Sequence, residues 1–237
     1  MDEPSDAAGQ VLTRQEISAA VSGWGWRYVL GVVRTSIQVR SLAEAARVAA
    51  TVVDACGGDV DGRLTIDVRR FRVVLSLQSS ATASITSREI ELAGRISSTV
   101  GELQLSTTPD VGTDAPRSVQ LVELGIDALD IALIRPFWKA VMGYADEPGA
   151  SGPQDPLVDP IGQGPAIWFQ QMDAPRPQRN RIHLDVSVPH DEAAARIQAA
   201  MDAGGRVLSD AAAPAFWVLA DPEGNEACVC TWQGRDG

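Results

Sequence analysis

The chain has 237 residues, 45% of them hydrophobic and 22% charged, so it is long enough to bury the cores of two small domains. Its 31 acidic and 20 basic residues give a net charge of −11, which argues against non-specific binding to nucleic acid or to an anionic membrane. No apolar run reaches the roughly 18 residues of a membrane span, and the first ten residues are acidic and polar, unlike a signal peptide. We therefore expect a cytoplasmic protein that binds neither nucleic acid nor membranes.

The stretch 101–117 separates two regions with different patterns. It contains two prolines, two glycines and several Ser and Thr residues without apolar periodicity, which is the composition of a linker. We place a first domain at residues 10–102, the linker at 103–117 and a second domain at 118–233.

The first region contains three sequence patterns that predict the start of a helix. In each, a hydroxyl that can accept from a free amide stands three positions before a glutamate that can reach back, the pattern of a capping box. The three pairs are Thr13/Glu16, Ser41/Glu44 and Thr86/Glu89. Segments of alternating apolar character follow the first two helices, near 32–39, 64–68 and 70–77. The predicted order is helix, strand, helix, strand, strand, helix.

Several short segments of this region fall in the order of a known family. They are the Leu12-Thr13 helix start, Trp24 and Trp26 before the first strand, DVDGRL at 59–64 and SITSREIELAGRI at 84–96. On these residues, region 10–102 resembles the pterin-4a-carbinolamine dehydratase family. The resemblance implies an α+β fold with helices on one face of an antiparallel sheet.

This region departs from the family where the family carries its acid/base groups. Cys56, Gly57 and Gly58 stand in place of two adjacent histidines and a proline, and Gln78 in place of a further histidine. Dehydration of a carbinolamine needs proton transfers that imidazoles perform well near neutral pH and that glycine cannot perform. The domain is therefore expected to be a scaffold or a binding module. The alternative is a 4a-hydroxytetrahydrobiopterin dehydratase with altered active-site residues.

The second region repeats one pattern of elements. A strand at 120–128, a helix that starts at Asp130 and stops at Gly143, and a strand at 166–172 are followed by a similar set. That set comprises a strand at 182–188, a helix at 191–203 and strands near 206–208, 216–220 and 226–232. Two similar halves indicate an internal duplication.

Five segments of this region occur in the order and spacing of a second family. They are FWKAVMGY (137–144), AIWFQQM (166–172), NRIHLDVSV (180–188), AGGRVL (203–208) and FWVLADPEGNEACV (216–229). On them, region 118–233 resembles the glyoxalase-like branch of the vicinal oxygen chelate superfamily. The resemblance implies a pair of βαβββ modules whose curved sheet surrounds a cavity. Four inward-facing positions hold a divalent ion in the metal-dependent members, so a divalent metal is a candidate cofactor.

The four positions fall on Glu123, Gln170, His183 and Cys228, with Glu226 as an alternative to Cys228 because it lies two residues earlier on the same strand face. Glu123, His183 and Glu226 would be good ligands for iron, manganese or zinc. Alternatively, His183 is a cavity histidine that bonds Glu123 or Gln170 without an ion. In either case the resemblance makes Glu123 and His183 the candidate catalytic pair.

Several aromatic residues lie on the elements that the resemblance places around the cavity of His183. Trp138, Trp168 and Phe216, together with Gln170, are candidates for binding a flat, largely apolar small molecule, although core packing is the default for each aromatic. We therefore expect a small-molecule enzyme of the lyase or isomerase type, or a binding protein, with its working cavity in the second domain. A non-catalytic sequestration protein is the alternative, and self-association through either domain is a further expectation.

Overall fold

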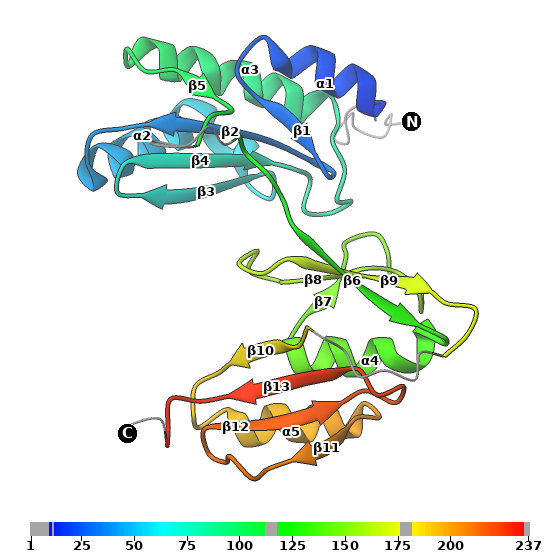
Figure 1. The fold of residues 1–237 in the computed structure, drawn as a ribbon. Helices are drawn as coiled ribbons and strands as arrows, with labels where there is room; N and C mark the ends of the chain where they lie inside the picture. The colour runs from blue at the N-terminus through cyan, green and yellow to red at the C-terminus, as the bar shows by residue number, and fades with distance from the viewer. Residues whose placement is uncertain (1–9, 11, 112–117, 176–181, 235–237) are drawn as a thin grey trace, which may run out of the picture. The chain divides into compact units, whose positions relative to one another are not determined.

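The computed structural model describes residues 10, 12–111, 118–175 and 182–234. The chain divides into two units, Met1–Leu121 and Val122–Gly237, each with its own hydrophobic core (Figure 1). Residues 112–117 of the expected linker lie outside the described residues. None of the described helices is both long and apolar enough to span a membrane.

Unit 1 combines an antiparallel sheet with α-helices on one of its faces (Figure 1). Its helices are α1 (Arg14–Ser22), α2 (Leu42–Cys56), α3 (Ser87–Glu102) and the short 3₁₀ helix η1 (Gly57–Val60). Its strands are β1 (Arg27–Val29), β2 (Val32–Gln38), β3 (Leu64–Arg69), β4 (Arg72–Leu77) and β5 (Thr107–Thr108). The order across the sheet is β1-β2-β4-β3, and β5 also pairs with β2. The mixed α+β architecture predicted for this region is confirmed, with β1 and β5 in addition.

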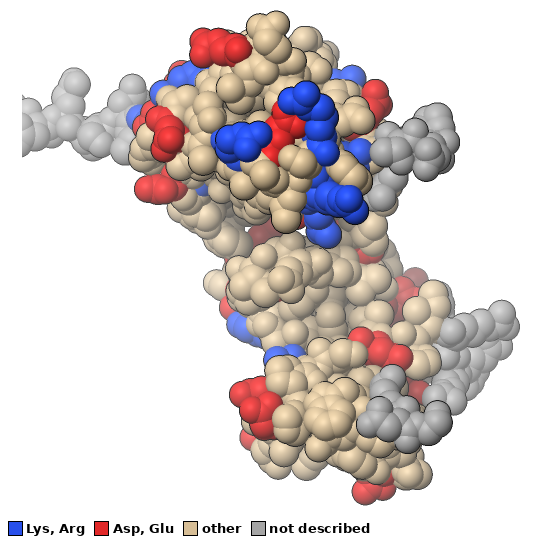
Figure 2. All heavy atoms as spheres, turned by 90° about the vertical axis from the view of Figure 1, so that its left-hand side faces the viewer, with Lys and Arg blue, Asp and Glu red and all other residues tan. Residues whose placement is uncertain are grey.

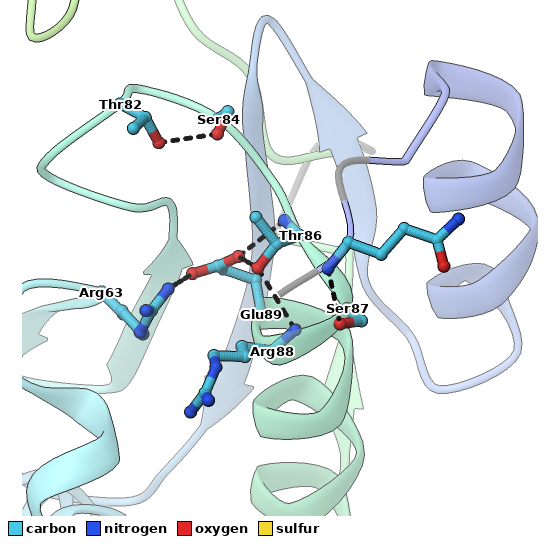
Figure 3. A network of polar contacts seen from close by, with 8 residues as sticks. Arg63, Thr82, Ser84, Thr86, Ser87, Arg88 and Glu89 are labelled. Carbon is cyan, nitrogen blue, oxygen red and sulfur yellow. Dashed lines mark hydrogen bonds and ion pairs between the residues drawn. The ribbon is translucent and has the colours of Figure 1, made fainter. Parts of the chain in front are cut away.

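The predicted helix start at Thr86 forms a network that reaches beyond its own helix (Figure 3). The Glu89 carboxylate accepts from the backbone N–H and from the hydroxyl of Thr86, both at 2.6 Å. Glu89 is fully buried and also pairs with the guanidinium of Arg63, which precedes β3. Because a buried carboxylate needs a counter-charge, this pair ties the start of α3 to the sheet.

The other two predicted helix starts are also present, one of them with a shifted partner. Thr13 forms a complete capping box with its glutamate. The Ser41 hydroxyl accepts from the backbone N–H of Glu44 at 3.2 Å, but the Glu44 carboxylate accepts from the backbone N–H of Arg40 at 2.7 Å. It also pairs with the Arg40 guanidinium at 2.8 Å, and these bonds lower the pKa of Glu44 to about 2.

The residues that follow α3 belong to unit 1. β5 pairs with β2 and passes so close to Gly25 that a Cβ atom there would lie 2.1 Å from the carbonyl oxygen of Thr107. Further along, the backbone N–H of Val119 donates to the carbonyl of Pro109 at 2.8 Å. The structure thus assigns 103–111 and 118–121 to unit 1, and the boundary between the units follows Leu121.

Unit 2 contains two modules with the same order of elements. The first comprises β6 (Glu123–Ala128), α4 (Ile131–Met142), β7 (Ala145–Asp146), β8 (Leu157–Val158) and β9 (Ala166–Gln171). The second comprises β10 (Leu184–Ser187), α5 (Ala193–Asp202), β11 (Arg206–Ser209), β12 (Phe216–Ala220) and β13 (Glu226–Cys230). The strand orders are β6-β9-β8-β7 and β10-β13-β12-β11. The duplicated βαβββ pattern is confirmed, but the described strands form two separate four-stranded sheets instead of one continuous curved sheet.

Helix α4 begins and ends where the sequence predicts, with one contribution from the other module. The Asp130 side chain accepts from the backbone N–H of Leu133 at 3.2 Å, and Gly143 ends the helix in the left-handed conformation, with a φ of 69°. The Glu223 carboxylate, from the turn between β12 and β13, accepts from the backbone N–H groups of Leu129 and Asp130 at 2.8 and 2.6 Å.

The turn that follows β12 is organised by the buried carboxylate of Asp221. This carboxylate accepts from the indole N–H of Trp138 in α4 at 3.0 Å and from the side-chain amide of Asn225 at 2.8 Å. It also accepts from the backbone N–H groups of Glu223 and Asn225, both at 2.9 Å. Asp221 therefore fixes the β12–β13 turn and joins it to the helix of the first module.

Replacing Asp221 by alanine is expected to lower the free energy of unfolding of unit 2 by about 3 kcal/mol or more, because the buried indole N–H of Trp138 and three partly buried N–H groups lose their acceptor at once. Hydrogen exchange read by mass spectrometry localises the effect: protection should fall in peptides from 122–234 and stay unchanged in those from 12–111. Asp210→Ala, at an exposed position of the same unit, is the matched control. Unchanged protection across β12 and β13 would contradict the role assigned to Asp221.

Candidate functional site

The second module of unit 2 gathers polar side chains on one face of its sheet. In the parallel pair β10–β13, Asp185 lies directly opposite Cys228. His183 lies two residues before Asp185, and Cys230 two residues after Cys228, so strand alternation places all four side chains on this face. The alternate residues of these strands pack into the core of unit 2.

Three of these side chains converge beside a cavity. The Nδ1 atom of His183 lies 3.2 Å from Oδ1 of Asp185 and 3.8 Å from Sγ of Cys228. One donor atom from each residue lies within 4.8 Å of the other two. The cavity has a volume of about 330 Å³, and Phe216 and Cys230 form part of its wall. The side chains of His183 and Asp185 are 53% and 59% exposed, whereas Cys228 is buried.

The environment of Cys228 holds its thiol in the protonated form. Burial raises the pKa of Cys228 to about 11, and the negative charge and hydrogen bond of Asp185 add to the effect. Cys230 and Glu226 raise the pKa further by their charges. Without a cation beside it, Cys228 is therefore a neutral thiol at physiological pH and a poor nucleophile.

The three donors fit a divalent cation of intermediate softness. An imidazole nitrogen, a carboxylate oxygen and a thiolate sulfur are all ligands that zinc accepts. Two ligands of tetrahedral zinc lie about 3.3 to 3.8 Å apart, which follows from bond lengths of about 2.0 to 2.3 Å. The separations of 3.2 and 3.8 Å between the donor atoms are close to these values. Three protein donors also leave a fourth position for water or a ligand.

Glu123 and Gln170 lie on the sheet of the first module. The β6–β9 register pairs Gly125 with Trp168 and Asp127 with Gln170, so strand alternation places Glu123, Trp168 and Gln170 on one face of that sheet. Burial raises the pKa of Glu147, and the negative charge of Glu123 raises it further. Among the described residues, the cluster around His183 does not include Glu123.

The remaining predicted residues of unit 2 take three different positions. Glu226 lies on the same face of β13 as Cys228 but outside the cluster of three donors. Phe216 lines the cavity. Trp138 is buried in the core and donates to Asp221, so it does not face the cavity.

Asp185 is the member of the cluster that the sequence interpretation missed. The signal was present in HLDVSV, because a residue two positions after His183 on a strand points to the same face. Matching the family's metal-binding positions to this sequence pointed to Glu123 and Glu226 as ligands instead.

The altered dehydratase positions of unit 1 carry structural bonds. The Gln78 amide donates to the carbonyl oxygens of Gly31 and Ala83 at 3.0 and 3.2 Å, which ties β4 to two neighbouring loops. Cys56 is the buried last residue of α2, and burial raises the pKa of its thiol. Gly57 and Gly58 begin η1 and bring no side-chain acid or base.

Comparison with known families identifies the class of unit 2. Residues 123–230 match the model of the family described as glyoxalase-like domain. This part of the chain is therefore a glyoxalase-like domain of the vicinal oxygen chelate type, as the sequence motifs predicted. No curated protein matches the chain.

Several solved structures are similar to parts of the chain. A glyoxalase/bleomycin resistance protein/dioxygenase family enzyme from Burkholderia phytofirmans PsJN is 18% identical, with a TM-score of 0.38 over 46% of this chain and 95% of that one. The fosfomycin resistance protein FosX from Listeria monocytogenes is 10% identical, with a TM-score of 0.39 over 50% and 95%. A transcriptional coactivator/pterin dehydratase from Brucella melitensis is 19% identical, with a TM-score of 0.34 over 38% and 98%.

The reactivity of Cys228 provides a test of the site's electrostatics. In metal-free buffer, its rate of alkylation by iodoacetamide is expected to rise about tenfold per pH unit up to a pH of about 11, because only the thiolate reacts. Asp185→Asn should shift the profile to lower pH, since it removes a negative charge that disfavours the thiolate. Peptide mass spectrometry follows the reaction, with Asp210→Asn as the control. A rate that levels off below pH 9 in the wild-type chain would contradict the prediction.

Proposed function

We propose that the glyoxalase-like domain binds a small molecule in the cavity beside His183, and that His183, Asp185 and Cys228 hold a divalent cation there. The convergence of three different donor atoms within 4.8 Å beside a cavity of about 330 Å³ supports this proposal. A bound cation would supply a Lewis acid that polarises an oxygen atom of the ligand. The metal set Glu123, His183 and Glu226 is replaced in this proposal by residues that the fold brings together.

The protein's own groups have defined tasks in this site. His183 must be neutral to offer Nδ1, and Cys228 must lose its proton to offer a thiolate. The Asp185 carboxylate offsets the charge of the cation, and Phe216 gives the ligand an apolar surface. Because the pKa of Cys228 is raised to about 11, cation binding releases its proton, and the affinity should rise about tenfold per pH unit in the neutral range.

Both an enzyme and a non-catalytic binding protein are compatible with these tasks, and one observation favours the second. The side chains of His183 and Asp185 are 53% and 59% exposed, whereas catalytic sites exclude water around the reacting groups. This exposure supports a sequestration protein as a second candidate function, beside an enzyme of the lyase or isomerase type. Unit 1 would be a scaffold or a second binding module in either case.

Zinc binding tests the proposal directly. The full chain is expected to bind one Zn²⁺ ion, and His183→Ala, Asp185→Ala and Cys228→Ser should each weaken binding. The loss should exceed about 100-fold, because even partners of metal ligands typically contribute 10- to 100-fold. Competition with a chromophoric chelator measures the affinity, and Cys56→Ser, which removes a buried thiol from unit 1, is the matched control. Equal zinc affinity in the wild type and the three variants would refute the site.

The fate of a bound molecule separates the two functions. Compounds are first selected that raise the melting temperature of the zinc-loaded chain but not that of Cys228→Ser. Each selected compound is then incubated with the zinc-loaded chain and recovered. Recovery of the unchanged compound at stoichiometric amount would support a binding protein. Conversion to a new mass over many turnovers, lost in His183→Ala, would support an enzyme.

A further inference from the structure

The open face of the unit 1 sheet carries a cluster of arginine side chains. The helices cover one face, toward which β2 and β4 direct buried residues such as Ile37 and Leu75 (Figure 1). Strand alternation directs the neighbouring residues to the opposite face, and the register places Arg69 opposite Arg72. By the same alternation Arg34 of β2 also faces away from the helices.

A cavity of about 360 Å³ lies on this face. Its charged residues are Arg34, Asp67, Arg69 and Arg72, and Val74 contributes apolar surface. All the described residues that line it belong to unit 1. Figure 2 views unit 1 from the end where β3 turns into β4, and a group of basic side chains, all of them arginines in this unit, lies there around few acidic ones. This end is locally basic in a chain whose net charge is −11.

Two of the three guanidinium groups have no carboxylate partner among the described residues. Asp67, the one acidic residue among the described residues that line the cavity, pairs with Arg69, whose Nε lies 2.9 Å from each carboxylate oxygen. Arg34 uses Nη1 for the carbonyl oxygen of Gln120 at 3.0 Å. Burial lowers the pKa of Arg34, and the charge of Asp67 opposes this only in part. Arg34 and Arg72 thus carry positive charge without an ion-pair partner among the described residues.

Buried polar atoms without a partner are concentrated on this same face. Among the described residues, the buried side-chain nitrogen and oxygen atoms without a hydrogen bond are Nε of Arg34, Oγ of Ser36 and Nε of Arg72. Native structures leave few such atoms, and each calls for an explanation. Their common position, on one face of one sheet and beside a cavity, indicates a missing acceptor.

We propose that this cavity is a binding site for the oxyanion group of a small molecule, either a phosphate or a carboxylate. The planar fork of a guanidinium matches both groups with two parallel N–H donors, and a charged acceptor forms the stronger bonds. The cavity also reaches the lower end of the volume range of ligand sites, so it accommodates more than the oxyanion itself. Val74 lies where the uncharged part of such a molecule would pack. This site is separate from the candidate zinc site of unit 2, because the residues that form it belong to unit 1.

The Nε–H groups themselves report on binding. NMR spectra that select arginine Nε–H pairs of the full chain are to be titrated with inorganic phosphate, phenyl phosphate and benzoate. The signals of Arg34 and Arg72 should shift with saturation, and phenyl phosphate should bind more tightly than inorganic phosphate because its ring contacts apolar surface. Response to the phosphates alone would identify a phosphoryl ligand, and response to benzoate alone a carboxylate. No shift of either signal with any of the three probes would overturn the proposal.

A matched pair of variants separates a binding role from a structural one. Arg72→Met should weaken phenyl phosphate binding at least tenfold, whereas Arg47→Met, at an exposed position of α2, should leave it unchanged. In urea without added anion, Arg72→Met should unfold at a concentration equal to or higher than the wild type, because it removes a buried donor that lacks an acceptor. Phenyl phosphate should raise the midpoint of the wild type but not of Arg72→Met. Unchanged binding, or a large loss of stability in the anion-free variant, would show that Arg72 serves the fold.

Discussion

The buried carboxylate of Asp221 is the interaction on which the second unit depends most. It accepts from the indole of Trp138 and from three N–H groups in its own turn, so one side chain determines both the path of the chain between β12 and β13 and the position of α4. A carboxylate without such donors would be costly to bury. The strand that carries Cys228 begins one residue after this turn, so the geometry of the candidate zinc site follows from the same bonds.

Local signals in the sequence predicted most elements of the fold. The capping boxes at Thr13 and Thr86 and the end of α4 at Gly143 were predicted correctly, because each depends on atoms within one helical turn. The sequence did not reveal that Arg63 would be the counter-charge of Glu89, because that contact joins residues 26 positions apart. Strand β5 was read as linker because two residues form too short a pattern to detect.

The candidate site shows the same division between local and distant information. Strand alternation alone groups His183 with Asp185, although the family positions led the interpretation past Asp185, whereas grouping Glu123 with Gln170 also requires the register between β6 and β9. It does not determine how two sheets are arranged, and the structure places these two groups on different sheets. Likewise, the alternation of β2 and β4 identifies the open face of unit 1. Only the register reveals that Arg69 and Arg72 lie side by side there.

The bonds from Glu223 to the backbone of Leu129 and Asp130 limit how the second unit can be divided. The internal duplication suggests two halves that might be separated, exchanged between relatives or expressed as fragments. Yet the first two amides at the entrance of α4 take their acceptor from a turn more than ninety residues away in the other half. A fragment that ends before β10 would expose these amides and the indole of Trp138 together. The repeats therefore cannot be treated as interchangeable parts, and recombination between relatives would have to transfer the acidic turn together with the helix it serves.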